Sequence, residues 1–142
     1  MCTILKEVVT ICIVKMKIES YLLRLIGGIQ IILGLAYLFA PALLLQSMGH
    51  SMPQPDIYYP LGMLAARFIA YGIALLAISS APAQHILWIN LMILIQAIDL
   101  LVGIVYTATG VLPLSLSGFP MFNAVWIILL LALWRPRAES IR

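Results

Sequence analysis

Four long apolar stretches limit what this chain can fold into, because a helix needs about 20 apolar residues to cross the ~30 Å hydrocarbon core of a bilayer. The sequence predicts such spans at residues 22–45, 61–80, 86–106 and 119–134. Only 9% of the 142 residues are charged, whereas a soluble domain has about 25%. This composition excludes soluble globular, disordered and disulfide-scaffold proteins. We therefore expect an all-α integral membrane protein, a four-helix transmembrane bundle over residues 21–136.

The positive charges lie near the two ends of the chain. Seven of the eight Lys and Arg residues are Lys6, Lys15, Lys17, Arg24, Arg135, Arg137 and Arg142. Segments rich in Lys and Arg stay in the cytoplasm, and an even number of spans puts both tails on the same side. The sequence therefore predicts cytoplasmic N and C termini, with tails at residues 1–20 and 137–142. This placement of charge gives no support for nucleic-acid binding.

Residues 1–15 admit two interpretations. Their apolar side chains could line a helix that lies on the membrane surface. Alternatively, the chain naturally begins at Met16, and the preceding residues come from an upstream start codon. A signal peptide is disfavoured because no small-residue cleavage site follows Val14. Cys2 and Cys12 both fall in this segment, which argues against a structural disulfide.

Two residues of opposite charge, Arg67 and Asp99, lie inside predicted spans. At 1.5 Å per residue, Arg67 is about 9 Å and Asp99 about 10 Å below the same outer membrane edge. An unpaired charge at this depth is costly. We therefore expect the two side chains to form an intramembrane ion pair.

Four other polar residues, one from each predicted span, are expected to reach the same depth in the membrane as Arg67 and Asp99. They are Tyr37, Tyr71, Gln96 and Asn123. Three interpretations follow. The favoured one is a structural pair that fixes helix register. The second is a ligand pocket for a polar head group or a quinone-like ring. The third is a proton or ion path, although one acid and one base near a single membrane face make a poor relay.

Small residues recur at every fourth position of the second span, at Gly62, Ala66, Ala70 and Ala74. Such a stripe lets another helix backbone approach closely. The partner is either a helix of the same chain or another subunit. The first span is expected to allow a close helix contact in the same way, through Gly27, Gly28 and Gly34.

No pattern in the sequence predicts catalysis. His50 and His85 lie on opposite sides of the predicted membrane, so they cannot share a metal or a haem. Each is expected to be a solvated loop residue, and contact with a quinone is the less favoured alternative. Cys/His metal spacing, a phosphate-binding glycine loop and a nucleophile elbow are all missing from the sequence. We expect a protein that is not an enzyme and that has no metal or cofactor.

Three segments resemble small bacterial four-helix membrane proteins of the DoxX-like and BphX-like families. They are residues 24–41, which contain RLIGG and LAYLFAP, residues 67–72 (RFIAYG) and residues 123–126 (NAVW). Members of these families often end the first span with G-L-x-x-L-x-A-P and open the second with an Arg. The resemblance covers about residues 20 to 136 and implies a four-helix bundle in the bacterial inner membrane. It carries no agreed catalytic residues.

The sequence thus predicts a non-catalytic multi-pass protein, first of all an accessory or assembly subunit of a membrane complex. The alternative is a binding protein for a quinone-like or other lipophilic small molecule in the outer half of the bundle. A small transporter comes third. Membrane lipids are the expected partners, together with a larger complex or a homo-oligomer.

Overall fold

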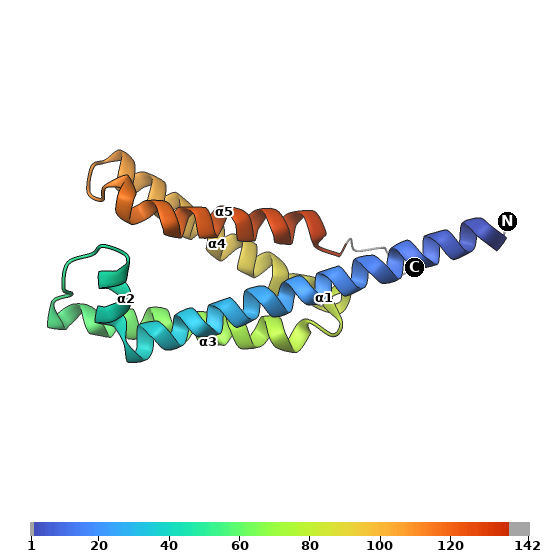
Figure 1. Cartoon of the computed structure of the whole chain (residues 1–142), viewed down its shortest axis with the longest axis horizontal. Helices are drawn as coiled ribbons and strands as arrows, with labels where there is room; N and C mark the ends of the chain where they lie inside the picture. The colour runs from blue at the N-terminus through green and yellow to red at the C-terminus, as the bar shows by residue number, and fades with distance from the viewer. Residues whose placement is uncertain (1, 137–142) are drawn as a thin grey trace.

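The computed structural model describes residues 2–136, and helices are the only regular secondary structure within them (Figure 1). The α-helices are α1 (Cys2–Phe39), α2 (Pro41–Ser47), α3 (Tyr58–Ile78), α4 (Ile86–Ala108) and α5 (Leu114–Trp134). Short 3-10 turns, η1 (Pro55–Ile57) and η2 (Pro82–His85), precede α3 and α4. Four of the described helices are long and apolar enough to cross a membrane. The prediction of an all-helical chain with four candidate spans is confirmed.

The first predicted span extends too far toward its C-terminal end. The sequence predicts helix to residue 45, but α1 ends at Phe39 and the chain restarts as the separate helix α2. Proline has no backbone N–H and disfavours helical geometry in the residue before it. Ala40, which precedes Pro41, accordingly has φ −139° and ψ 48°.

The fourth predicted span begins too late. The Gly, Ser and Pro content of residues 107–118 predicts a loop up to residue 118, yet α5 begins at Leu114. Pro113 is extended, with φ −71° and ψ 151°, and the chain enters the helix directly after it. Helix α5 even contains Pro120. This proline lies beyond the first four residues of the helix, so it removes the backbone hydrogen bond that residue 120 would donate to the carbonyl of Leu116.

Helix α1 is longer than a membrane is thick. Its 38 residues extend over about 57 Å at 1.5 Å per residue, against ~30 Å of hydrocarbon. Its apolar candidate span is Val14–Phe39. Residues 2–13, for which a surface helix was one of the two interpretations, continue α1 without a break and reach past the ends of the other helices (Figure 1).

The four long helices pack as two pairs, α1 along α3 and α4 along α5 (Figure 1). Glycine allows close approach in each pair. A Cβ on Gly34 of α1 would lie 3.0 Å from the carbonyl oxygen of Ala65 in α3. A Cβ on Gly103 of α4 would lie 2.6 Å from Cγ of Met121 in α5. Contacts between the pairs are far fewer than those within them.

The small-residue stripe of α3 does not form these contacts. The stripe is Gly62, Ala66, Ala70 and Ala74; Ala66 and Ala70 are exposed, and a Cβ on Gly62 would meet nothing within 4 Å. Helix α3 instead meets α1 through the neighbouring face, which carries Ala65, Ile69 and Gly72. Gly62, Ala66 and Ala70 therefore give no support for packing of the stripe on a helix of the same chain. Contact with another subunit stays a prediction.

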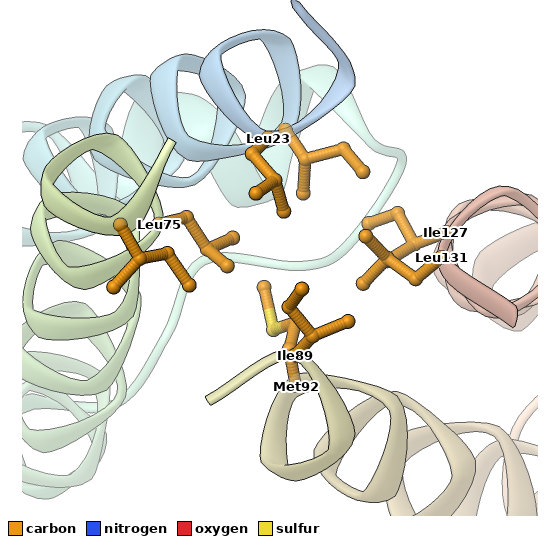
Figure 2. Close-up of a cluster of buried hydrophobic side chains, with 8 residues drawn as sticks. Leu23, Leu75, Ile89, Met92, Ile127 and Leu131 are labelled. Carbon is orange, nitrogen blue, oxygen red and sulfur yellow. The ribbon is translucent and has the colours of Figure 1, made fainter. Parts of the chain in front are cut away.

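A cluster of buried side chains joins the two pairs at one end (Figure 2). Each long helix contributes two members, and together they are Leu23, Ile26, Leu75, Ile78, Ile89, Met92, Ile127 and Leu131. We call this set the core cluster. It lies where α3 ends and α4 begins, and from there the pairs diverge toward α2 and the α4–α5 connection (Figure 1).

Candidate functional site

A cleft of about 720 Å³ lies between the two helix pairs, on the side of the core cluster where they diverge. Its walls come from α1, α3, α4 and α5, with further residues from α2 and the segment after it. Its volume falls within the range of about 300–1,000 Å³ that is typical of ligand pockets. Most lining side chains are apolar, and those from the long helices include Leu33, Leu64, Phe68, Val102, Phe119 and Met121.

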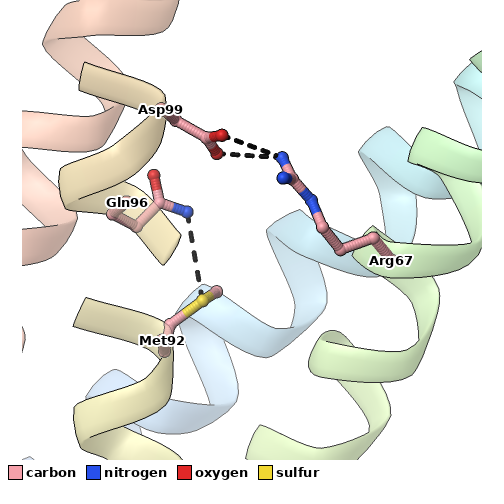
Figure 3. Close-up of polar contacts among 4 residues, drawn as sticks. All are labelled: Arg67, Met92, Gln96 and Asp99. Carbon is pink, nitrogen blue, oxygen red and sulfur yellow. Dashed lines mark hydrogen bonds and ion pairs between the residues drawn. The ribbon is translucent and has the colours of Figure 1, made fainter. Parts of the chain in front are cut away.

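The ion pair of Arg67 and Asp99 crosses this cleft from α3 to α4 (Figure 3). Nη2 of Arg67 donates to both carboxylate oxygens of Asp99, at 2.9 Å and 3.1 Å. The side chains are 36% and 33% exposed, so the pair is open to the cleft and not sealed inside dry packing. The ion pair therefore links the two helix pairs and also offers polar atoms to a bound molecule.

Part of the Arg67 guanidinium remains unused. Both contacts with Asp99 come from Nη2, and the buried Nε has no hydrogen-bond partner. The guanidinium carbon lies 5.5 Å from the centre of the Phe68 ring, within cation–π distance. Phe68 in turn stacks on Tyr37 of α1, with ring centres 5.8 Å apart. Arg67 is thus held between an aromatic face and a carboxylate.

Gln96 lies on α4 one turn below Asp99 and is almost fully buried, at 3% exposure. Its Nε2 donates to Sδ of Met92 at 3.9 Å (Figure 3), and a thioether sulfur is a weak acceptor. Gln30 of α1, which the sequence analysis did not single out, is 1% exposed, and its Nε2 has no partner. Amide groups this poorly satisfied are costly in an apolar interior.

The structure places three of the four predicted pocket residues in the wall of the cleft and one outside it. Tyr37, Gln96 and Asn123 line the cleft, whereas Tyr71 does not. Tyr71 packs against the core cluster, and its ring meets Trp88 edge to face with centres 6.3 Å apart. It lies one turn below Arg67, where the helix pairs have already converged. Tyr71 is therefore not part of the wall of this cleft.

Sequence reasoning missed the cleft residues that lie outside the four spans or at their ends. Leu44, Ser47, Met48 and His50 line the cleft from α2 and the turn after it. Gly49 in this turn has φ +87°, and a Cβ on it would lie 3.4 Å from Cδ2 of Leu116 in α5. The segment thus reaches from α1 across to α5. His50, expected to be a solvated loop residue, belongs to the cleft wall.

Asn123 and Ser117 of α5 are already engaged in hydrogen bonds. Oδ1 of Asn123 accepts from Nε1 of Trp126 at 3.0 Å, and the Ser117 hydroxyl lies 2.7 Å from that of Thr107 in α4. These two residues shape the α4–α5 wall. Among residues 2–136, no group of three or more His, Cys, Asp or Glu side chains is placed to hold a metal ion.

Comparison of the chain with protein-family models, curated proteins and solved structures finds no match. We therefore infer the function from the geometry of the cleft.

Proposed function

We propose that this chain is a non-catalytic multi-pass membrane protein that binds one lipophilic small molecule with a polar end in the cleft between its helix pairs. The observation that carries this proposal is the open 720 Å³ space directly beside the Arg67–Asp99 pair. A pair that served only to fix helix register would be expected in close, dry packing. Here the apolar walls suit an alkyl or isoprenoid tail, and the pair suits a polar end.

The core cluster favours binding over passage through the bundle. Ile26, Leu75, Ile89, Met92 and Ile127 each have less than 2% exposure and fill the space between the helices at the end opposite to the cleft. A transported solute or ion would have to pass these apolar side chains. The cleft therefore suits a molecule that enters and leaves from the same side.

The proposal also includes the orientation of the chain and the membrane in which it lies. The lack of Lys and Arg in the connections 46–60 and 107–118 supports cytoplasmic termini, which would place the cleft in the outer half of the bilayer. The resemblance to DoxX-like and BphX-like proteins supports the bacterial inner membrane. A quinone-like compound is one molecule with the required shape.

A role as an accessory subunit, or assembly with a second copy, is the second candidate. It is favoured by the exposure of Ala66 and Ala70 on α3, because small residues on a lipid-facing helix surface allow another helix to pack closely. This role is compatible with ligand binding, since the two alanines are not part of the cleft wall.

Two matched tryptophan variants test the binding proposal. Val102 and Val105 both lie on α4 and are 46% and 45% exposed, but only Val102 lines the cleft. Val102→Trp places an indole ring in the cleft one helical turn from Asp99, whereas Val105→Trp adds the same bulk at a position that does not line the cleft. Native mass spectrometry of protein gently extracted from its membrane should show one lipophilic molecule per chain in wild type and Val105→Trp, and none in Val102→Trp.

Both variants should retain the helical circular dichroism and the thermal unfolding midpoint of the wild type. Equal retention of the small molecule by the two tryptophan variants would contradict the proposal. Co-purification of stoichiometric protein subunits, with no small molecule on any variant, would support the accessory role instead.

A further inference from the structure

The wall of the cleft carries one positive and one negative side chain, whose charges cancel. Among the lining residues, Arg67 carries the positive charge and Asp99 the negative charge, and the others are apolar or uncharged polar residues apart from His50. The two charges are in direct contact at 2.9 Å. A molecule that enters the cleft therefore meets a polar wall with no net charge.

Hydrogen-bond donors remain on this wall although its charge is balanced. Asp99 accepts only from Nη2 of Arg67, and no described residue accepts from Nη1, whereas the unpaired Nε is buried and does not face the cleft. The amide nitrogen of Gln96 has only the Met92 sulfur as a partner. Donors that face an apolar space without a good acceptor favour a ligand that brings an oxygen acceptor.

We propose that the cleft selects an uncharged amphiphile whose polar end carries a carbonyl-type oxygen, which accepts hydrogen bonds from Arg67 and Gln96. This inference rests on the proposed binding function and adds the chemical class of the ligand. Asp99 acts here as the counter-charge that keeps the donors of Arg67 available without making the cleft attractive to anions.

Charged amphiphiles are disfavoured for a simple electrostatic reason. An anionic head group at Arg67 would stand beside the carboxylate of Asp99, and a cationic one at Asp99 would stand beside the guanidinium. Like charges repel strongly where the surroundings are apolar and the effective dielectric constant is low. An uncharged carbonyl avoids both contacts and leaves the ion pair intact.

Three amphiphiles with the same octadecyl chain test this selection, namely octadecanamide, octadecyl sulfate and octadecyltrimethylammonium. Each is titrated by native mass spectrometry against wild type, Asp99→Asn and Arg67→Gln. The first substitution keeps the size of the side chain, and the second replaces the guanidinium with a shorter, uncharged polar group. Wild type should bind the amide about tenfold more tightly than either charged probe. Asp99→Asn should gain about tenfold for the sulfate, and Arg67→Gln should gain as much for the trimethylammonium.

A double variant, Arg67→Gln with Asp99→Asn, keeps the test valid if a single variant does not fold. Its cleft is again neutral, so it should still prefer the amide over both charged probes, but bind it more weakly than wild type because the guanidinium donors are lost. A double variant that binds the sulfate as tightly as the amide would overturn the charge-selection proposal.

The controls separate this inference from the binding function itself. If wild type and both single variants rank the three probes identically, and Val102→Trp still blocks binding, charge selection is wrong and the cleft remains a binding site. If Val102→Trp binds all three probes as well as Val105→Trp does, the binding function is wrong and the selection proposal falls with it.

Discussion

Gly27 of α1 and Gly72 of α3 bring two helix backbones into direct contact. A Cβ on Gly72 would lie 2.7 Å from the carbonyl oxygen of Gly27, and a Cβ on Gly27 would lie 2.9 Å from that of Gly72. In a bilayer, helices associate mainly through close packing and interhelical hydrogen bonds, because lipid tails are as apolar as leucine. This contact is one reason why α1 and α3 form the tighter of the two pairs.

The first prediction concerns this glycine contact. Gly72→Ala should lower the free energy of unfolding by about 1–3 kcal/mol, the usual cost of overpacking, because the new methyl group would meet backbone atoms of Gly27 and Ile31 that cannot rotate away. Gly28→Ala is the matched control, since a Cβ there meets nothing within 4 Å. Unfolding by sodium dodecyl sulfate, followed by circular dichroism, measures the difference. Equal losses in the two variants would contradict the close contact.

The second prediction concerns the ion pair. Arg67→Leu leaves Asp99 unpaired within the bundle and should destabilise it by about 2–3 kcal/mol, the order of cost measured for a charge in a membrane span. Adding Asp99→Leu should recover most of this loss, because both charges are then gone. The same detergent unfolding assay measures both variants. If the single and double variants are equally stable, the pair does not link α3 to α4.

The third prediction concerns the hydrogen bond between Thr107 of α4 and Ser117 of α5, whose hydroxyl oxygens are 2.7 Å apart. Thr107→Val should cost about 0.6 kcal/mol and at most about 1.7 kcal/mol, as other interhelical hydrogen bonds in membranes do. Thr109→Val is the control, because the Thr109 hydroxyl bonds only to carbonyls of its own helix. Thermal unfolding in the same lipid or detergent compares the two. A larger loss in Thr109→Val would argue against a helix-joining role.

The hydropathy of the sequence and the depth of each residue below the membrane edge predicted the four spans and the ion pair. The four candidate spans follow from the length of apolar helix needed to cross it. Counting residues from a common membrane edge predicted that Arg67 and Asp99 lie at the same level, and the structure brings them into contact. The same counting put Tyr71 in the pocket, because depth along a helix does not tell where two helix pairs converge.

The face that each helix turns toward its partner could not be predicted in the same way. Helix α3 carries small residues on two adjacent faces, one with Ala66 and Ala70 and the other with Ala65 and Gly72. In a soluble protein the polar face would mark the outside, but in lipid both faces are apolar and the pattern loses this signal. His50 was missed for another reason, since only the break at Pro41 folds its segment over the cleft.

The divergence of the two helix pairs makes the molecule a wedge (Figure 1). A ligand between the pairs would hold them apart at the wide end against any pressure that closes the cleft, while the packed core cluster keeps the narrow end unchanged. The lateral pressure in one leaflet of the membrane therefore opposes binding, and that in the other leaflet does not. We expect lipids that relieve this pressure in the leaflet around the wide end to tighten the binding of the same ligand.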